Sequence, residues 1–271
     1  MKKTQLIKIG LFGVPRSGTS WLSQIFNSHP DIIFRFQPLF SYEHKGRITE
    51  SSSRAEIDLF FEEIEQSKDP FALMQTDSHH NYPTFEKSCF PNSIAFKETR
   101  YLHLIENILV QCPDVRVVGI VRNPLTTLAS WVKAPKEFNS DWDIEQEWRF
   151  AHRKNMHRIE EYNGFEKWKQ VATDFLSFQK EYPEQFLLVR YEDLRKNPFD
   201  KTKELFQFCG LESSPQVEEF LVQSRSKYDP SPYSVFRSKN TGDNWQEILP
   251  AAVSDSIQSE LSGTPLSTFI E

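Results

Sequence analysis

The chain has few cysteines and no long apolar run, and each absence argues against a class of protein. Its three cysteines, Cys89, Cys112 and Cys209, are far apart and form no C-x-x-C pair. This argues against a disulfide framework and against a cysteine zinc site. No segment approaches the roughly 20 consecutive apolar residues that cross a bilayer, and Lys8 interrupts the first apolar run. We therefore interpret the start of the chain as a strand rather than a signal peptide and expect a cytoplasmic protein.

An excess of positive charge is also missing. The chain carries 32 Lys and Arg against 38 Asp and Glu, a net charge of −6 at pH 7. A general nucleic-acid binder needs a basic surface that displaces counterions from phosphates, so we expect no nucleic-acid partner and only local anion sites. There is no internal repeat or low-complexity tract, which disfavours a solenoid. The length of 271 residues and the apolar content of 38% favour a single domain over residues 1–271.

Apolar and amphipathic stretches alternate along the chain. Short runs rich in Ile, Val, Leu and Phe are followed by longer amphipathic segments, the pattern of a parallel sheet with helical crossovers, and so we predict an α/β fold. The expected strands are residues 6–12, 93–97, 116–121 and 186–190. The expected helices are residues 18–28, 57–65, 102–111, 124–132, 144–160, 165–181, 197–209 and 246–261.

The stretch GLFGVPRSGTSWL, residues 10–22, has the glycine spacing of a phosphate-binding loop. An apolar strand precedes it and a helix follows, so that backbone N–H groups and the helix N-terminus can face one anion. Ser17, Thr19 and Ser20 add hydroxyl donors, and Arg16 adds a positive charge. A simple turn needs none of these side chains, which indicates an anion site.

The loop lacks the lysine of G-x-x-x-x-G-K-[ST], and Thr19 stands in its place. A nucleotide triphosphatase also needs an aspartate at another strand end to hold magnesium, whereas the strand at 116–121 is followed by Arg122. A P-loop nucleotide kinase is therefore the least favoured alternative, and we expect an anion bound without a metal. The pair His79-His80 near Asp77 does not change this, because adjacent histidines rarely face one ion.

A second strand-to-helix corner lies in VVGIVRNPLTTLASW, residues 117–131. Asn123 suits the N-cap and Pro124 the first helical position. Arg122 stands at the corner and Ser130 lies about two turns along the helix, so they can meet only on a ligand that lies along its face. Two such corners in one parallel sheet predict a ligand with two separated anionic groups at the carboxyl ends of the strands.

At this point the residues resemble the sulfotransferase family, whose donor is 3′-phosphoadenosine 5′-phosphosulfate and whose nucleotide product is 3′,5′-diphosphoadenosine. GVPRSGTSWL resembles the family's 5′-phosphosulfate loop, and VRNPLTTLAS resembles its 3′-phosphate motif. LVRYEDL is similar to a strand-plus-tyrosine element near adenine, and FRSKNTGDNW to a C-terminal loop over the nucleotide. The first two motifs together are specific, and the four cover most of the chain in the family's order.

The resemblance implies a P-loop-like three-layer sandwich that moves a sulfuryl group, without a metal, to an acceptor hydroxyl or amine by in-line displacement. Fixed positive groups would act there because negative charge grows on the departing phosphate, and the resemblance assigns this role to Arg16 and to Lys97 at a strand end. The donor-binding residues it implies are Pro15, Arg16, Ser17, Gly18, Thr19, Ser20, Arg122, Ser130, Tyr191, Lys239, Asn240 and Gly242.

The acceptor must lose a proton, so a general base is expected. Where related members carry a glutamate, this chain has Gln37 in FRFQPLF, and an amide cannot serve as a base. Gln37 is expected to bind the acceptor instead. Glu98, beside Lys97, is the leading candidate base, although strand alternation can point one of the pair away; Glu43 and His103 are the alternatives.

The acceptor is expected to be a carbohydrate, either a glycan or a lipid-linked oligosaccharide. Arg16 favours this because many carbohydrate and tyrosylprotein members carry arginine in the loop, where members acting on phenols and steroids carry lysine. Trp148 and Asn155 suit a sugar ring, although an aromatic at helical spacing is often core. A tyrosylprotein, a small molecule and a nucleotide-binding module without transfer are the alternatives. Residues 41–91 are either a surface excursion or a loop that contacts substrate.

Overall fold

The centre of the molecule is a parallel β-sheet. The computed structural model describes residues 6–79, 82–236 and 244–270. Five strands lie in the order β2-β3-β1-β4-β5, and every neighbouring pair is parallel. The strands are β1 Ile7–Phe12, β2 Ile32–Phe36, β3 Ser93–Glu98, β4 Val115–Val121 and β5 Phe186–Arg190. The parallel sheet expected from the sequence is confirmed, with β2 as an additional strand at its edge.

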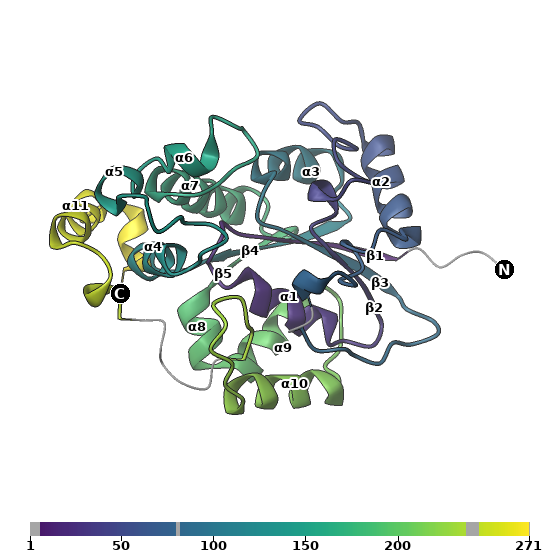
Figure 1. Cartoon of the computed structure of the whole chain (residues 1–271). Coiled ribbons are helices and arrows are strands. Elements are labelled where there is room, and N and C mark those ends of the chain that lie inside the picture. Colours follow the sequence, from purple (N-terminus) through teal and green to yellow (C-terminus); the bar gives the residue numbers. More distant parts are fainter. Residues whose placement is uncertain (1–5, 80–81, 237–243, 271) are drawn as a thin grey trace.

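Helices cover both faces of the sheet (Figure 1), with α1, α8, α9 and α10 on one side and α2, α3 and α7 on the other. The α-helices are α1 Thr19–Asn27, α2 Arg54–Gln66, α3 Ile105–Gln111, α4 Pro124–Val132, α5 Ile144–Glu147, α6 His152–Asn155, α7 Phe165–Glu181, α8 Tyr191–Lys196, α9 Pro198–Phe208, α10 Pro215–Ser226 and α11 Ala251–Leu261. The 3₁₀-helices are η1 Pro38–Phe40, η2 Asp77–His79, η3 Leu102–Leu104, η4 Trp245–Glu247 and η5 Pro265–Phe269. The predicted three-layer α/β architecture is confirmed.

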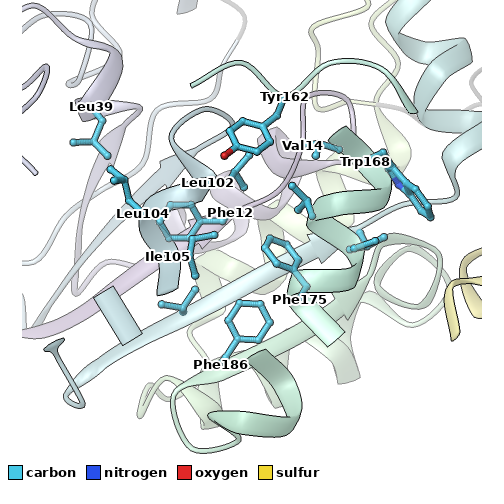
Figure 2. Packing of buried hydrophobic residues seen from close by; sticks show 14 of the residues in the cluster. Phe12, Val14, Leu39, Leu102, Leu104, Ile105, Tyr162, Trp168, Phe175 and Phe186 are labelled. Carbon is cyan, nitrogen blue, oxygen red and sulfur yellow. The ribbon is translucent and has the colours of Figure 1, made fainter. Parts of the chain in front are cut away.

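Strand alternation divides the core into two clusters, one on each face of the sheet. In β1, Ile9 and Leu11 pack with α1, α9 and α10, whereas Phe12 packs on the opposite face, where its ring lies 5.5 Å from that of Phe96. Figure 2 shows part of this second cluster, in which Phe12, Ile105 and Phe175 come together. Because both faces are buried, the strands are nearly continuous apolar runs, and polar chemistry is confined to their carboxyl ends.

The helix expected at residues 144–160 is wrong. The chain forms the short helices α5 and α6 there, because Ala151 and Met156 adopt left-handed backbone conformations with φ of 48° and 47°. The buried carboxylate of Glu147 accepts a hydrogen bond from the backbone N–H of Arg153 at 3.0 Å. The break therefore places a capping group from α5 on the first turn of α6, which an uninterrupted helix does not allow.

Neither β2 nor α10 was predicted from the sequence. The apolar run of β2 is only five residues long and directly follows His29-Pro30-Asp31, a setting that also suits a loop. The signals for α10 were present, with Pro215 at its start and Val217, Phe220 and Leu221 buried on one face. Within the described ranges, no helix combines the length and apolar character needed to cross a membrane.

Candidate anion-binding site

The first loop, residues 13–18, connects β1, the central strand, to α1. Two of its residues have left-handed backbone conformations, Arg16 with φ of 71° and Gly18 with φ of 90°. A Cβ on Gly18 would lie 2.3 Å from Cδ2 of Tyr191, and a Cβ on Gly13 would lie 2.6 Å from the carbonyl oxygen of Ile120. Glycine is thus required at both positions, since the loop is pressed against β4 on one side and α8 on the other.

The loop presents hydrogen-bond donors that the protein itself leaves unused. The Ser17 side chain is fully buried, and its Oγ has no hydrogen-bond partner. No side chain caps α1 at Gly18, and its first turn holds no acidic residue. Buried polar groups normally have partners, and an uncapped helix N-terminus attracts anions. These features fit an anion held by the Ser17 hydroxyl and the loop backbone.

Arg16 joins the first loop to the second strand-to-helix corner. Its Nε donates a hydrogen bond to Oγ of Ser130 at 3.2 Å, and its Nη2 donates to the carbonyl oxygen of Pro232 at 2.5 Å. The guanidinium also lies 5.4 Å from the ring centroid of Tyr233. The two strand-to-helix corners predicted separately from the sequence are therefore directly connected.

Arg122 belongs to the same site. Its Nη1 donates to the carbonyl oxygen of Arg16 at 3.2 Å, and its guanidinium lies 4.7 Å from the ring centroid of Tyr191. On the other side, the indole Nε1 of Trp168 in α7 donates to the carbonyl oxygen of Arg122 at 2.9 Å. The next residue, Asn123, accepts hydrogen bonds from the N–H groups of Leu125 and Thr126. The predicted N-cap is confirmed, and Arg122 is fixed from both sides.

The two neighbouring charged residues at the end of β3 point to opposite faces of the sheet. The ammonium of Lys97 lies 4.5 Å from the ring centroid of Phe36, on the same face as α1. Oε1 of Glu98 accepts a hydrogen bond from the N–H of Leu39 at 2.8 Å, on the other face. Strand alternation separates the pair, so Glu98 is not brought to the side of Lys97.

Burial shifts the pKa of both residues. It lowers the pKa of the Lys97 ammonium to about 8, and the carboxylates of Glu98 and Glu137 counteract this in part. It raises the pKa of the Glu98 carboxyl to about 8, against the opposing effect of the hydrogen bond from Leu39. At pH 7 Lys97 is therefore mostly a cation, whereas Glu98 is mostly a neutral acid.

Gln37 lies at the end of β2, next to Lys97. Its backbone N–H donates to the carbonyl oxygen of Lys97 at 2.8 Å, and its side-chain Nε2 donates to Oγ1 of Thr99 at 2.6 Å. The alternative bases have other partners: Glu43 accepts from Ser67, and Nδ1 of His103 lies 3.3 Å from the Tyr162 hydroxyl. Gln37 is thus held at the carboxyl end of the sheet, where the first loop also lies.

Trp148 and Asn155 make their contacts within their own region of the chain. Trp148 packs against Phe165, with ring centroids 5.7 Å apart. The Asn155 amide donates to the carbonyl oxygens of Phe150 and Asn163 and accepts from the N–H of Asn163. These contacts hold both side chains in place, and their role in binding the acceptor stays a prediction.

Two residues at the site carried no signal in the sequence. The Tyr82 hydroxyl donates to Oγ of Ser20 at 3.2 Å, so that residues 41–91 reach the first helix. Oε1 of Glu137 lies 3.9 Å from Nη1 of Arg16. Neither residue belongs to a sequence motif. Only tertiary packing brings their two segments to the loop, and local patterns do not show such packing.

A cavity of about 430 Å³ lies along β2, between that strand and residues 73–91. His79 and Tyr82 line it near the first loop, and Arg35 and Lys87 add cationic side chains. Burial lowers the pKa of His79 to about 4, and the charges of Lys97 and Lys136 lower it further. A neutral imidazole at pH 7 follows.

Three predicted donor contacts, Lys239, Asn240 and Gly242, lie outside the described residues. Within the described part of the chain, no group of three or more His, Cys, Asp or Glu side chains could hold a metal ion. The three cysteines are free, Cys89 at the surface and the others buried.

Comparison with known proteins matches this chain to one family. A family model described as "Sulfotransferase family" matches residues 9–215. Carbohydrate sulfotransferase 1 of Mus musculus is 23% identical over an alignment of 310 positions, gaps included. The alignment covers 90% of this chain and 74% of the relative. The corresponding protein of Danio rerio is 24% identical, with 81% of this chain and 65% of the relative covered.

The fold is shared with a solved structure. A crystal structure of a mouse sulfotransferase complexed with PAP has a TM-score of 0.58 at 16% identity, covering 97% of this chain and 86% of that one.

Proposed function

The chain belongs to the sulfotransferase family, and we propose that it transfers a sulfuryl group from 3′-phosphoadenosine 5′-phosphosulfate to a carbohydrate hydroxyl. The observation that carries the proposal is the hydrogen bond between Arg16 and Ser130, which joins the two anion corners. A donor with phosphates at both its 3′ and 5′ positions needs two such anchors close together. The similar mouse sulfotransferase was crystallised with PAP, which supports this choice of donor.

We assign the 5′ end of the donor to the first loop. The N–H groups and hydroxyls of residues 15–20 would hold the phosphosulfate, and the buried Ser17 Oγ would gain the partner that it lacks. Arg122 and Ser130 would hold the 3′-phosphate, and Tyr191 would lie near adenine. The segment with Lys239, Asn240 and Gly242 is proposed to cover the nucleotide.

Arg16 and Lys97 are proposed to stabilise the transition state. As the acceptor oxygen bonds to sulfur, the bond between sulfur and the bridging oxygen breaks, and its electron pair stays on the departing 5′-phosphate. Fixed cations stabilise this growing charge without rearranging at the moment of reaction. Among the described residues the Lys97 ammonium contacts the ring of Phe36 and makes no hydrogen bond, so it is available to an oxygen of the sulfuryl group. In this proposal the protein's own cations supply the charge that a metal supplies elsewhere.

The acceptor is proposed to be a carbohydrate. The curated relatives are carbohydrate sulfotransferases, and the loop carries an arginine, as many carbohydrate members do. Gln37 is proposed to contact the acceptor because its backbone is hydrogen-bonded to Lys97 at the carboxyl end of the sheet. A glycan, a lipid-linked oligosaccharide, a tyrosine peptide and a phenol remain distinguishable by experiment.

A transfer assay with radiolabelled sulfate on the donor tests the function. The wild-type protein is offered glycans, phenols and tyrosine peptides, and Arg16→Ala serves as the inactive control. Label on a glycan alone supports the proposal, and label on a peptide or phenol alone corrects the acceptor. Tight binding of the nucleotide product without transfer to any acceptor would identify a binding module, and magnesium-dependent ATP turnover would identify a kinase.

A further inference from the structure

Glu137 stands out because packing fixes it in a turn next to the anion site. The N–H groups of Glu137 and Phe138 both donate to the carbonyl oxygen of Ala134 at 2.8 Å. The Phe138 ring packs edge-on against Trp131 and Trp142, with centroid distances of 4.9 and 5.5 Å. The position of the Glu137 backbone therefore follows from a rigid aromatic anchor rather than from a mobile surface loop.

The Glu137 carboxylate lies near residues that the proposed function places around the reacting atoms. In the part of the chain that the structure describes, it is the one carboxylate within 4.0 Å of the Arg16 guanidinium. Its negative charge also raises the pKa of the buried Lys97 ammonium and the pKa of the hydroxyls of Tyr82 and Tyr233. These residues come from β3 and from two separate loops, and Glu137 lies among them.

A role as a simple partner of Arg16 does not account for Glu137. The N–O distance of 3.9 Å is too long for a hydrogen bond, and Arg16 is already held by Ser130 and Pro232. A carboxylate beside an arginine that binds an anionic donor weakens donor binding through charge repulsion. A site built only to hold the donor has no use for this negative charge, whereas a carboxylate can accept the proton that an acceptor hydroxyl loses.

Glu98 is poorly placed for that proton transfer. Its side chain is fully buried, points to the opposite face of the sheet from Lys97, and accepts a hydrogen bond from Leu39. The Glu137 side chain is 23% exposed, which allows it to meet an acceptor and afterwards release a proton to water. Glu98 is therefore buried and turned away from Lys97, whereas the Glu137 side chain is accessible to solvent.

We propose that Glu137 is the general base of the transfer, which rests on the proposed function. The acceptor hydroxyl oxygen forms a bond to sulfur as the bond from sulfur to the bridging phosphate oxygen breaks. The hydroxyl proton goes to the Glu137 carboxylate, and the electron pair of the broken bond stays on the departing phosphate. Glu137 then loses the proton to solvent, which restores the carboxylate for the next cycle.

The test compares Glu137→Gln with wild type in kcat and in affinity for 3′,5′-diphosphoadenosine. Loss of a general base lowers turnover by about 10²–10⁴-fold, so we expect a fall of this size with product affinity unchanged or tighter. Glu145→Gln, which removes an exposed carboxylate of α5, is the matched control and should keep wild-type turnover. Formate added to Glu137→Ala should restore part of the lost activity, because it replaces the missing carboxylate.

Four outcomes would overturn the inference. Wild-type turnover in Glu137→Gln excludes a base at this position, and weaker product binding in that variant assigns Glu137 to the support of Arg16. A collapse of turnover in Glu98→Gln, with Glu137→Gln active, moves the base to β3. If the wild-type protein itself binds the nucleotide but transfers nothing to any acceptor, the proposed function fails first and the assignment of Glu137 fails with it.

Discussion

The Nε of Arg16 and the Oγ of Ser130 are hydrogen-bonded at 3.2 Å although the two residues are 114 positions apart in the sequence. The bond links a loop after β1 to a helix after β4, and these strands are neighbours in the sheet. Arg122 adds a second link between the two corners, because its side chain donates a hydrogen bond to the carbonyl oxygen of Arg16. One ligand can therefore touch both corners, and each corner can be tested by its own substitution.

Replacement of Arg122 by alanine tests the 3′-phosphate anchor. The free energy of product binding should weaken by about 1–3 kcal/mol, the range for loss of a charge-assisted hydrogen bond. Isothermal titration calorimetry with 3′,5′-diphosphoadenosine measures this. Arg225→Ala, an exposed position near the end of α10, should bind as wild type does. Unchanged affinity in Arg122→Ala would remove the 3′-phosphate assignment.

Arg16→Ala separates transition-state stabilisation from simple binding. The departing phosphate gains charge only during the reaction, so kcat should fall by a larger factor than product affinity. Steady-state kinetics together with calorimetry give both numbers. Arg16→Lys, which keeps a charge but loses the planar fork of donors, should fall between alanine and wild type. Equal losses in kcat and affinity would reduce Arg16 to a binding residue.

Lys97 should give the reaction an alkaline limit. Its pKa is lowered to about 8 by burial, so the ammonium is present below that pH and is lost above it. The value of kcat/KM for the donor should therefore fall above about pH 8, since this parameter reports the free enzyme. Lys97→Met should have low activity without this limb, and Lys180→Met on α7 should keep it. A wild-type profile that is flat to pH 10 would contradict the role of Lys97.

Glu98 should make the folded state less stable as the pH rises. Burial raises its pKa from 4.5 to about 8, so between these values the unfolded chain releases a proton that the folded chain keeps. The folded state then binds more protons, and the free energy of unfolding falls with pH, by at most about 1.4 kcal/mol per unit. The contribution is complete below about pH 4.5 and lost above about pH 8.

Glu98→Gln removes this dependence and keeps the shape of the side chain. Urea unfolding at pH 5 and at pH 8 should show the variant gaining stability relative to wild type as the pH rises. Glu62→Gln, an exposed carboxylate of α2, is the matched control and should show no such gain. Parallel wild-type and Glu98→Gln curves would show that Glu98 is ionised in the folded state.

Much of the fold was predictable because short stretches of the sequence indicate their own secondary structure. The apolar runs of β1, β3 and β4 are buried on both faces and that of β5 is partly buried, and such runs are recognisable without a partner. The edge strand β2 was missed since its five residues follow a proline turn. The break between α5 and α6 was missed because the capping contact of Glu147 with Arg153 depends on how the segment folds back.

By itself, the sequence determined the strands β1, β3, β4 and β5, the two strand-to-helix corners and the anionic ligand that they predict. Glycine spacing, an N-cap and a proline act over a few residues, so they can be recognised without the fold. Only the tertiary structure decided that Lys97, and not Glu98, lies on the face of the sheet that α1 covers, and that Glu137 lies beside Arg16. The turn that holds Glu137 is fixed by Phe138 between Trp131 and Trp142, a packing contact that no local pattern in the sequence encodes.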